Sequence, residues 1–289
     1  MRKLIVGCGY VGRRVAKEWL EQGDEVFAVT RSESNAELLR SLGVEPIIAD
    51  VTQPETLTAI PPIDTLLYAV SHDRSAGYPP RVTYVEGLNN FLKYAAHLPT
   101  RMIFVSSTSV YGVDDGSEVD EDTPTAATTE SGRAYVEAET DFWRGFWRKH
   151  QDSRIGVVLR SAGIYGPDRL LRRVASLRNQ DPIPANPDGW LNLIHVDDLV
   201  QAILKSELAS ESGTVLVCDD RPIQRREYYT KLAELVGASS PVFNSEGKET
   251  SLGKRCNNRL LREKFGLELR FPTIDSGLPH AVDTNNQER

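Results

Sequence analysis

The residues with the clearest chemical meaning form a glycine-rich segment near the start of the chain, Gly7-Cys8-Gly9-Tyr10-Val11-Gly12. Apolar residues 3–6 before it predict a buried strand, and residues 13–22 after it predict a helix. This spacing is typical of a dinucleotide site. Gly7 permits the tight turn, Gly9 lets the backbone approach a pyrophosphate, and Gly12 lets the helix pack close to the strand. Because a helix N-terminus offers N–H groups to phosphates, we expect a dinucleotide to bind at this turn.

The tip of the next predicted strand, residues 25–30, bears on which dinucleotide binds. A carboxylate there would bind the ribose 2′-hydroxyl of NAD, but this chain has Thr30-Arg31-Ser32. An arginine between two hydroxyls suits a 2′-phosphate, so the pattern favours NADP, with NAD as the alternative cofactor. The other interpretation is that Arg31 is merely solvated.

A run of hydroxyl side chains follows the predicted strand 102–106 and comprises Ser106-Ser107-Thr108-Ser109. Open α/β sheets bind ligands at the carboxyl ends of their strands, where a serine or threonine can hydrogen-bond a substrate carbonyl. Such hydroxyls can equally satisfy the backbone of their own turn. The residues alone leave both interpretations open.

Composition excludes several classes of protein. The chain has 289 residues, 40% of them hydrophobic and 26% charged, with a net charge of −7. The absence of a long basic run argues against a nucleic-acid surface, and no apolar run reaches membrane-spanning length. The first strand begins at once and the cysteines are far apart, which predicts a cytoplasmic protein with reduced thiols and no metal site.

Strands and helices alternate along the chain, which predicts an α/β fold with a doubly wound parallel sheet of the Rossmann type. Predicted strands cover residues 3–6, 25–30, 44–48, 65–70, 102–106, 155–159 and 214–217. Predicted helices cover residues 13–22, 35–42, 54–59, 81–97, 131–150, 169–178, 198–208, 225–236 and 257–265. The polar, acidic residues 113–130 predict a long loop, whose length favours a functional role.

The simple alternation ends near residue 165, so we expect two intertwined parts. Residues 1–165 form the dinucleotide-binding domain, whose sheet is completed by later residues, roughly 191–218. Residues 166–275 form a small carboxyl-terminal lobe for a small-molecule substrate. The polar residues 276–289 predict a disordered tail.

Three further motifs occur in the order known from one family. They are Val105-Ser106-Ser107-Thr108-Ser109-Val110-Tyr111-Gly112, Leu159-Arg160-Ser161-Ala162-Gly163-Ile164-Tyr165-Gly166-Pro167 and Asn192-Leu193-Ile194-His195-Val196-Asp197-Asp198-Leu199. Together with the glycine segment, they resemble the extended short-chain dehydrogenase/reductase family, which includes sugar-nucleotide epimerases and dehydratases. The resemblance runs from residue 3 to about residue 200 and implies the Rossmann fold and an NAD(P) cofactor.

The resemblance also implies positions for individual residues. Asp50 and Val51 would lie beside the adenine, and Ala69-Val70-Ser71 would line the ribose and phosphates of the cofactor. Ser107 takes the position of the serine that polarises the substrate, with Thr108 beside it. A set in the small lobe would lie near its cleft: Tyr165, Trp190, Asn192 and His195. For His195 we favour a structural role, packed under a helix that Asp197 or Asp198 caps.

The family's acid/base pair, a tyrosine with a lysine four residues later, has no counterpart in either of two registers. With Tyr135 as the tyrosine, Glu139 stands where the lysine belongs, and a carboxylate there would raise the pKa of the phenol. In the other register, Gly132 and Glu139 match the family's glycine and glutamate, so Ser131 replaces the tyrosine and Tyr135 the lysine. We prefer this register because it matches more residues and lies 24 residues from Ser107. Such chains resemble the atypical, YeeZ-type members of the family.

Two functions are consistent with these residues. The first is an NAD(P)-dependent oxidoreductase or epimerase/dehydratase-like enzyme for a small polar, sugar-derived substrate, with Ser107, Thr108, Ser131 and Tyr135 as the candidate catalytic residues. The second is a non-catalytic NAD(P)-binding sensor or regulatory protein. By family resemblance alone, a homodimer would form through helices 81–97 and 131–150.

Overall fold

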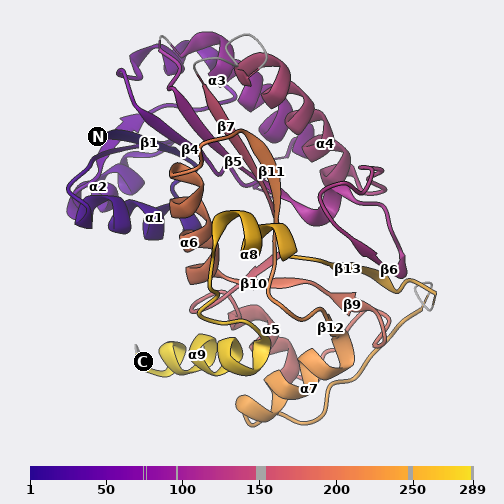
Figure 1. Ribbon diagram of the computed structural model, residues 1–289. Coiled ribbons are helices and arrows are strands. Elements are labelled where there is room, and N and C mark those ends of the chain that lie inside the picture. The colour runs from indigo at the N-terminus through magenta and orange to yellow at the C-terminus, as the bar shows by residue number, and fades with distance from the viewer. Residues whose placement is uncertain (74, 76, 96, 148–153, 247–249, 288–289) are drawn as a thin grey trace. The chain divides into compact units, whose positions relative to one another are not determined.

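The structure is a computed structural model that describes residues 1–73, 75, 77–95, 97–147, 154–246 and 250–287. Its largest sheet has seven strands. The strand order is β11-β7-β5-β4-β1-β2-β3 (Figure 1). The strands are β1 (Arg2–Val6), β2 (Glu25–Thr30), β3 (Glu45–Ile48), β4 (Thr65–Tyr68), β5 (Arg101–Ser107), β7 (Ile155–Ser161) and β11 (Gly213–Val217). The pairs β1/β2, β1/β4, β2/β3 and β4/β5 are parallel. The predicted doubly wound α/β sheet is therefore confirmed.

The order of the strands reverses beside β1. From β1 the sheet extends through β2 and β3 on one side and through β4 and β5 on the other. Ligands of such sheets bind outside the carboxyl ends of the strands at this reversal. The carboxyl ends of β1 and β4 are thus where the topology predicts a binding site.

The middle parts of the central strands are apolar because helices cover the sheet. The β1 residues Leu4, Ile5 and Val6 and the β4 residues Leu66 and Leu67 are all buried. The covering helices are α1 (Tyr10–Glu21), α2 (Glu33–Ser41), α3 (Gly87–Tyr94), α4 (Glu130–Phe142) and α6 (Val196–Glu207). A π-helical turn, η2 (Val82–Glu86), precedes α3, and a second one, η4 (Trp143–Trp147), continues α4.

The chain divides into two compact units with intertwined boundaries. Unit 1 comprises Met1–Tyr111, Thr125–Arg160 and Val200–Val215, and unit 2 comprises Gly112–Pro124, Ser161–Leu199 and Leu216–Arg289. Unit 1 therefore contains the glycine turn and the hydroxyl run. We expected residues 113–130 to belong wholly to the dinucleotide-binding domain, but residues 113–124 lie in unit 2.

Unit 2 is built from short strands and helices around its own core. Its elements are β6 (Asp115–Val119), β8 (Gly163–Tyr165), α5 (Leu171–Arg178), β9 (Trp190–Leu191), β10 (Leu193–His195), β12 (Ile223–Gln224), α7 (Arg225–Leu235), β13 (Gly253–Cys256), α8 (Arg259–Phe265) and α9 (Ile274–Gln287). The core includes the buried Tyr165, Leu193, Tyr228 and Leu278. Of residues 191–218, which we expected to complete the central sheet, Gly213–Val217 joins it as β11, whereas Leu191 pairs with β12.

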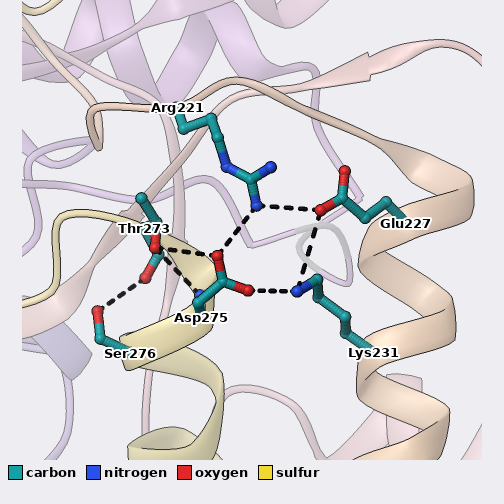
Figure 2. Close-up of polar contacts among 6 residues, drawn as sticks. All are labelled: Arg221, Glu227, Lys231, Thr273, Asp275 and Ser276. Carbon is teal, nitrogen blue, oxygen red and sulfur yellow. Dashed lines mark hydrogen bonds and ion pairs between the residues drawn. The ribbon is translucent and has the colours of Figure 1, made fainter.

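Charged side chains connect α7 with the beginning of α9 (Figure 2). Arg221 contacts Glu227 at 3.0 Å and Asp275 at 3.2 Å, and Lys231 pairs with the same two carboxylates. All four side chains are at least one-third exposed, so this network adds little to stability. It nevertheless orients α9 within unit 2.

The structure corrects several local predictions. The predicted loop 113–130 contains β6, which pairs in parallel with β13 from the far end of the chain. The predicted disordered tail is helical to Gln287, because Leu278 and Ala281 are buried in the core of unit 2. Residues 54–59 form a 3-10 helix, and the predicted helix 131–150 extends at its end beyond the described residues. Among the described helices, none is both long enough and apolar enough to cross a membrane.

Candidate dinucleotide-binding site

The glycine turn joins β1 to α1 and lies against the end of β4. Gly7 has a φ of +95°, and a Cβ atom there would lie 2.5 Å from the backbone carbonyl carbon and oxygen of Ala69. Real Cβ atoms do not approach backbone so closely, so both the conformation and the space require glycine. At Gly12 a Cβ would lie 2.8 Å from the carbonyl oxygen of Gly7. These two glycines bring the turn, the helix and β4 together.

Gly9 differs from its neighbours because a Cβ there would meet nothing within 4 Å. It is the N-cap of α1, offers no capping side chain, and is followed by no acidic residue in the first helical turn. Burial raises the pKa of the Cys8 thiol to about 12, so no thiolate lies beside this space. An open space at the positive end of a helix, free of negative charge, fits a pyrophosphate.

At the tip of β2, the structure separates the three predicted residues. Thr30 is buried, and the Ser32 hydroxyl accepts a hydrogen bond from the backbone N–H of Asn35 as the N-cap of α2. Arg31 is exposed, and its guanidinium lies 3.8 Å from the Asp73 carboxylate. That exposed pair is weak, so Arg31 remains available to an anion such as a 2′-phosphate.

The residues predicted beside the adenine and the ribose lie at the same edge of the sheet. The Asp50 Oδ1 atom accepts hydrogen bonds of 2.8 Å from the Thr52 N–H and hydroxyl. Val51 is buried against Gly87, where a Cβ would lie 2.7 Å from Val51 Cγ2. The Ala69 N–H donates to the Val6 carbonyl at 2.8 Å. After it, Val70 is half-buried and Ser71 is exposed.

The hydroxyl run ends β5 and begins a short 3-10 turn, η3 (Thr108–Val110). The Ser107 Oγ atom accepts a hydrogen bond of 3.1 Å from the Ser109 N–H. Ser107 therefore accepts a hydrogen bond from the backbone of its own turn, which was one of the two interpretations of the hydroxyl run. Its hydroxyl proton is not used in that bond, so the same side chain can still donate to a ligand. Thr108 is buried and Ser107 is half-buried.

The first turn of α4 packs against the end of β5. Thr129 is the N-cap, accepting a hydrogen bond from the Gly132 N–H at 3.1 Å. A Cβ at Gly132 would lie 2.3 Å from the Ser109 carbonyl oxygen, so this close approach requires glycine. The half-buried Ser131 is therefore positioned beside the turn that follows Ser107.

Tyr135, one turn further along α4, stacks on another tyrosine. Its ring lies 4.1 Å from that of Tyr84, at an interplanar angle of 27°. Burial, with a smaller contribution from Tyr84, raises the pKa of Tyr135 well above its usual value. The pKa shift has the predicted direction, but its cause is burial and not the carboxylate of Glu139. A phenol that stays protonated cannot act as a general base at neutral pH.

Glu139, one turn after Tyr135, forms a buried ion pair with Arg160. Its carboxylate accepts hydrogen bonds from the Ser106 hydroxyl at 2.6 Å and from Arg160 Nη2 at 2.8 Å. Arg160 also donates to the Tyr111 hydroxyl at 2.9 Å. This network links α4 to β5 and β7, so Glu139 has a structural role. That role agrees with the preferred register, in which Glu139 is the glutamate of the motif.

The residues predicted around the small-lobe cleft have structural partners within unit 2. His195 is fully buried and caps α6 itself, because its Nδ1 atom accepts from the Asp197 N–H at 3.2 Å. The prediction that Asp197 or Asp198 caps this helix is wrong, since His195 holds the cap position and the Asp198 carboxylate accepts from the Arg270 and Phe271 N–H groups. The side chain of Asn192 instead holds β13, accepting from the Cys256 N–H at 2.7 Å. Tyr165 is buried in the core of unit 2, and the Arg255 guanidinium lies 5.7 Å from the Trp190 ring.

Two residues at the sheet edge were not predicted from the sequence. His72 directly follows Ser71, and its N–H donates to the Tyr84 hydroxyl at 3.2 Å. The histidine could have been noticed because it extends the segment predicted to line the ribose. No pattern in the sequence pairs Tyr84 with Tyr135, because the contact joins two separate helices.

Comparisons with known proteins agree with this geometry. A model of the NAD dependent epimerase/dehydratase family matches residues 4–217. Protein YeeZ of Escherichia coli K12 is 28% identical over 282 residues, covering 94% of this chain and 97% of that protein. A ketoreductase of Stigmatella aurantiaca is 25% identical over 257 residues, covering 84% of this chain and 76% of that protein.

A solved structure extends the likeness to the whole fold. A candidate NAD-dependent epimerase/dehydratase from Methylobacillus flagellatus is 30% identical, with a TM-score of 0.77, covering 99% of this chain and 98% of that one. Sequence, fold and the geometry of the glycine turn therefore lead to one assignment. The chain belongs to the NAD-dependent epimerase/dehydratase family and is an atypical, YeeZ-like extended short-chain dehydrogenase/reductase.

Proposed function

We propose that the protein is an NADP-preferring oxidoreductase that reduces the carbonyl group of a small polar, sugar-derived molecule. The observation that carries this proposal is the open space at Gly9, in the turn that packs against the end of β4. The same unit contains the hydroxyl run that follows β5. Bound there, a reduced nicotinamide cofactor supplies a hydride. The relative from Stigmatella aurantiaca, named a ketoreductase, supports the same class of reaction.

Reduction suits these residues better than epimerisation or dehydration. Those reactions begin by taking a proton from a substrate, which needs a base whose pKa lies near neutrality. The only tyrosine in either register, Tyr135, has its pKa raised by burial. Carbonyl reduction instead needs a donor to the substrate oxygen. The Ser107 hydroxyl can fill that role while its Oγ atom accepts from Ser109.

The preference for NADP rests on the tip of β2. Arg31 is exposed there, and no carboxylate occupies residues 30–32 to bind a ribose 2′-hydroxyl. A guanidinium binds phosphate through charge-assisted hydrogen bonds, which are stronger than neutral ones. We therefore expect NADPH to bind more tightly than NADH.

The test begins with binding of NADPH and NADH, measured by calorimetry, and continues with NADPH oxidation in the presence of aldehydes, ketones and oxidised sugars. Ser107→Ala should lower kcat/KM by about 100-fold, as loss of one hydrogen-bond donor to a developing oxyanion does. Its affinity for NADPH should stay within about threefold, because Ser107 is assigned to the substrate. Ser109→Ala is the matched control, since it keeps the N–H that bonds to Ser107. Equal turnover by Ser107→Ala and the unaltered chain would contradict the assignment.

The raised pKa of Tyr135 supports a second candidate function, a non-catalytic sensor of NAD(P). A sensor would bind the dinucleotide and change conformation without turning over any compound. Tight NADPH binding together with no oxidation by the whole carbonyl panel would favour it. A chain that binds neither dinucleotide would exclude both functions.

A further inference from the structure

The imidazole of His72 lies at the edge of the sheet where we expect the cofactor to bind, and no function has so far been assigned to it. His72 follows Ser71 beyond the end of β4, the strand against which the glycine turn packs. Its side chain is half-buried. The ring centroid lies 6.0 Å from that of Tyr78 and 6.3 Å from that of Tyr84. The histidine is therefore part of the folded edge of the sheet.

The π-helical turn η2 provides the partners of His72. The Nδ1 atom of His72 lies 3.2 Å from the Thr83 hydroxyl, and the backbone N–H donates to the Tyr84 hydroxyl at 3.2 Å. Tyr84 in turn stacks on Tyr135 of α4. Short π-helical turns within helices are frequent at functional sites. Here Tyr84 of the turn connects His72 to Tyr135, which takes the lysine position in the preferred register.

The other side chains of this site are poor at exchanging protons near neutrality. Serine and threonine hydroxyls do not ionise in this range, and Tyr135 stays protonated. Glu139 is occupied by Arg160 and Ser106. A histidine is the side chain whose ordinary pKa suits proton transfer at neutral pH.

We propose that His72 is the proton-transfer residue of this site and takes the part that a tyrosine plays in the family pattern. This inference rests on the proposed reductase function. We assign a proton on Nδ1 to the hydrogen bond with the Thr83 hydroxyl, so that Nε2 is the nitrogen that gains and loses the second proton. During reduction, the substrate carbonyl carbon accepts the hydride, and its oxygen accepts the proton from His72 Nε2. The products are an alcohol, the oxidised cofactor and a neutral imidazole, which solvent protonates again.

Two charged groups lie near His72, one negative and one positive. Asp73 is the adjacent residue, and hydrogen bonds from Ser75 hold the pKa of its carboxyl below the usual value, so it remains negative. Arg31, which pairs with Asp73 at 3.8 Å, is the opposing positive charge. Among the described residues, the ring also lies near the phenol rings of Tyr78 and Tyr84 and the hydroxyl of Thr83.

The first experiment does not depend on turnover. The imidazole signals of the full chain are followed by NMR from pH 5 to 9, and His72→Gln identifies the signal of His72. We expect this signal to titrate, and saturating NADP⁺ to shift its midpoint by about half a pH unit through the added charges. His97→Gln, at an exposed histidine of the same unit, is the matched control and should leave the His72 titration unchanged. NADP⁺ binding without any change in the His72 titration would overturn the proposal while leaving the reductase function intact.

The second experiment uses a carbonyl compound that the unaltered chain reduces. His72→Gln should lower kcat by about 100-fold, the usual scale of general acid catalysis, with NADPH affinity within about threefold. It should also abolish the fall in kcat as the pH rises through the His72 midpoint. Thr83→Val, which removes the partner of Nδ1, should shift that midpoint and lower kcat less. An unchanged kcat and pH profile in His72→Gln would refute the proposal. Failure of the unaltered chain to bind any dinucleotide would instead refute the reductase function and this inference together.

Discussion

The glycine turn and the first turns of α4 lie at the same edge of unit 1, but they differ in how fully they match the residue pattern of the family. At the glycine turn, Gly7 and Gly12 meet the steric requirements of the dinucleotide fingerprint. On α4, Gly132 and Glu139 both have packing roles, as the preferred register implies, whereas that register puts Ser131 and Tyr135 at the tyrosine and lysine positions. In that register, the packing residues match the family pattern and the candidate catalytic residues do not. The comparison supports the proposed cofactor site in the first region, and the variants below test the chemistry of the second.

The largest effect should come from breaking the structural part of α4. Glu139→Ala leaves the Arg160 guanidinium buried without its carboxylate, so we expect a loss of about 3–5 kcal/mol in the free energy of unfolding. Urea denaturation followed by circular dichroism measures this loss. Glu137→Ala on the same helix removes only an exposed pair with Arg81 and should leave stability nearly unchanged. Equal stability of the two variants would show that Glu139 is not structural.

The next largest effect is expected at the glycine turn, where two variants separate its role in folding from its role in NADPH binding. A Cβ at Gly9 meets no protein atom but fills the space that fits a pyrophosphate. Gly9→Ala should therefore keep its thermal midpoint within a few degrees and bind NADPH about 100-fold more weakly. Gly7→Ala is the matched comparison, because its Cβ would collide with the Ala69 backbone. That variant should lose stability as well as binding. Full NADPH affinity in Gly9→Ala would remove the assignment of this space to the cofactor.

A smaller effect tests the cofactor preference at the tip of β2. Arg31→Ala should weaken NADPH binding about tenfold and leave NADH binding unchanged, since only NADPH carries the 2′-phosphate. Arg40→Ala on α2, where the arginine pairs with Glu33, is the control and should change neither affinity. Calorimetry with both nucleotides gives the ratio directly. Parallel losses for NADPH and NADH would mean that Arg31 does not read the 2′-phosphate.

The smallest effect is expected at Tyr135. Because burial keeps its phenol protonated, Tyr135→Phe should change kcat by no more than about twofold between pH 6 and 9. The phenyl ring can still stack on Tyr84, so folding should also be preserved. Steady-state kinetics across this pH range are the measurement. A loss as large as that of Ser107→Ala would restore Tyr135 as a direct participant in the chemistry.

Much of unit 1 was predictable because its signals are local. The strand 25–30 has the predicted bounds in the structure, and the alternation of apolar strands with amphipathic helices indicated the parallel sheet. The pairing of β6 with β13 was not predictable, because it joins segments more than 100 residues apart. The helix at the end of the chain was also missed. Its sequence is polar and contains Pro279, and only the contacts of Leu278 and Ala281 show why it folds.

The sequence by itself determined the sheet, the glycine turn and the family, because hydrophobic periodicity and glycine spacing act over a few residues. Only the tertiary structure decided what the titratable groups do. Tyr135 is a half-buried residue stacked on Tyr84, Glu139 is bound to Arg160, and His72 is bound to Thr83 through contacts between separate elements. A side chain's pKa depends on its burial and on neighbours from distant parts of the chain. Short-range patterns could therefore predict a cofactor site, whereas the environment of the titratable groups required the fold.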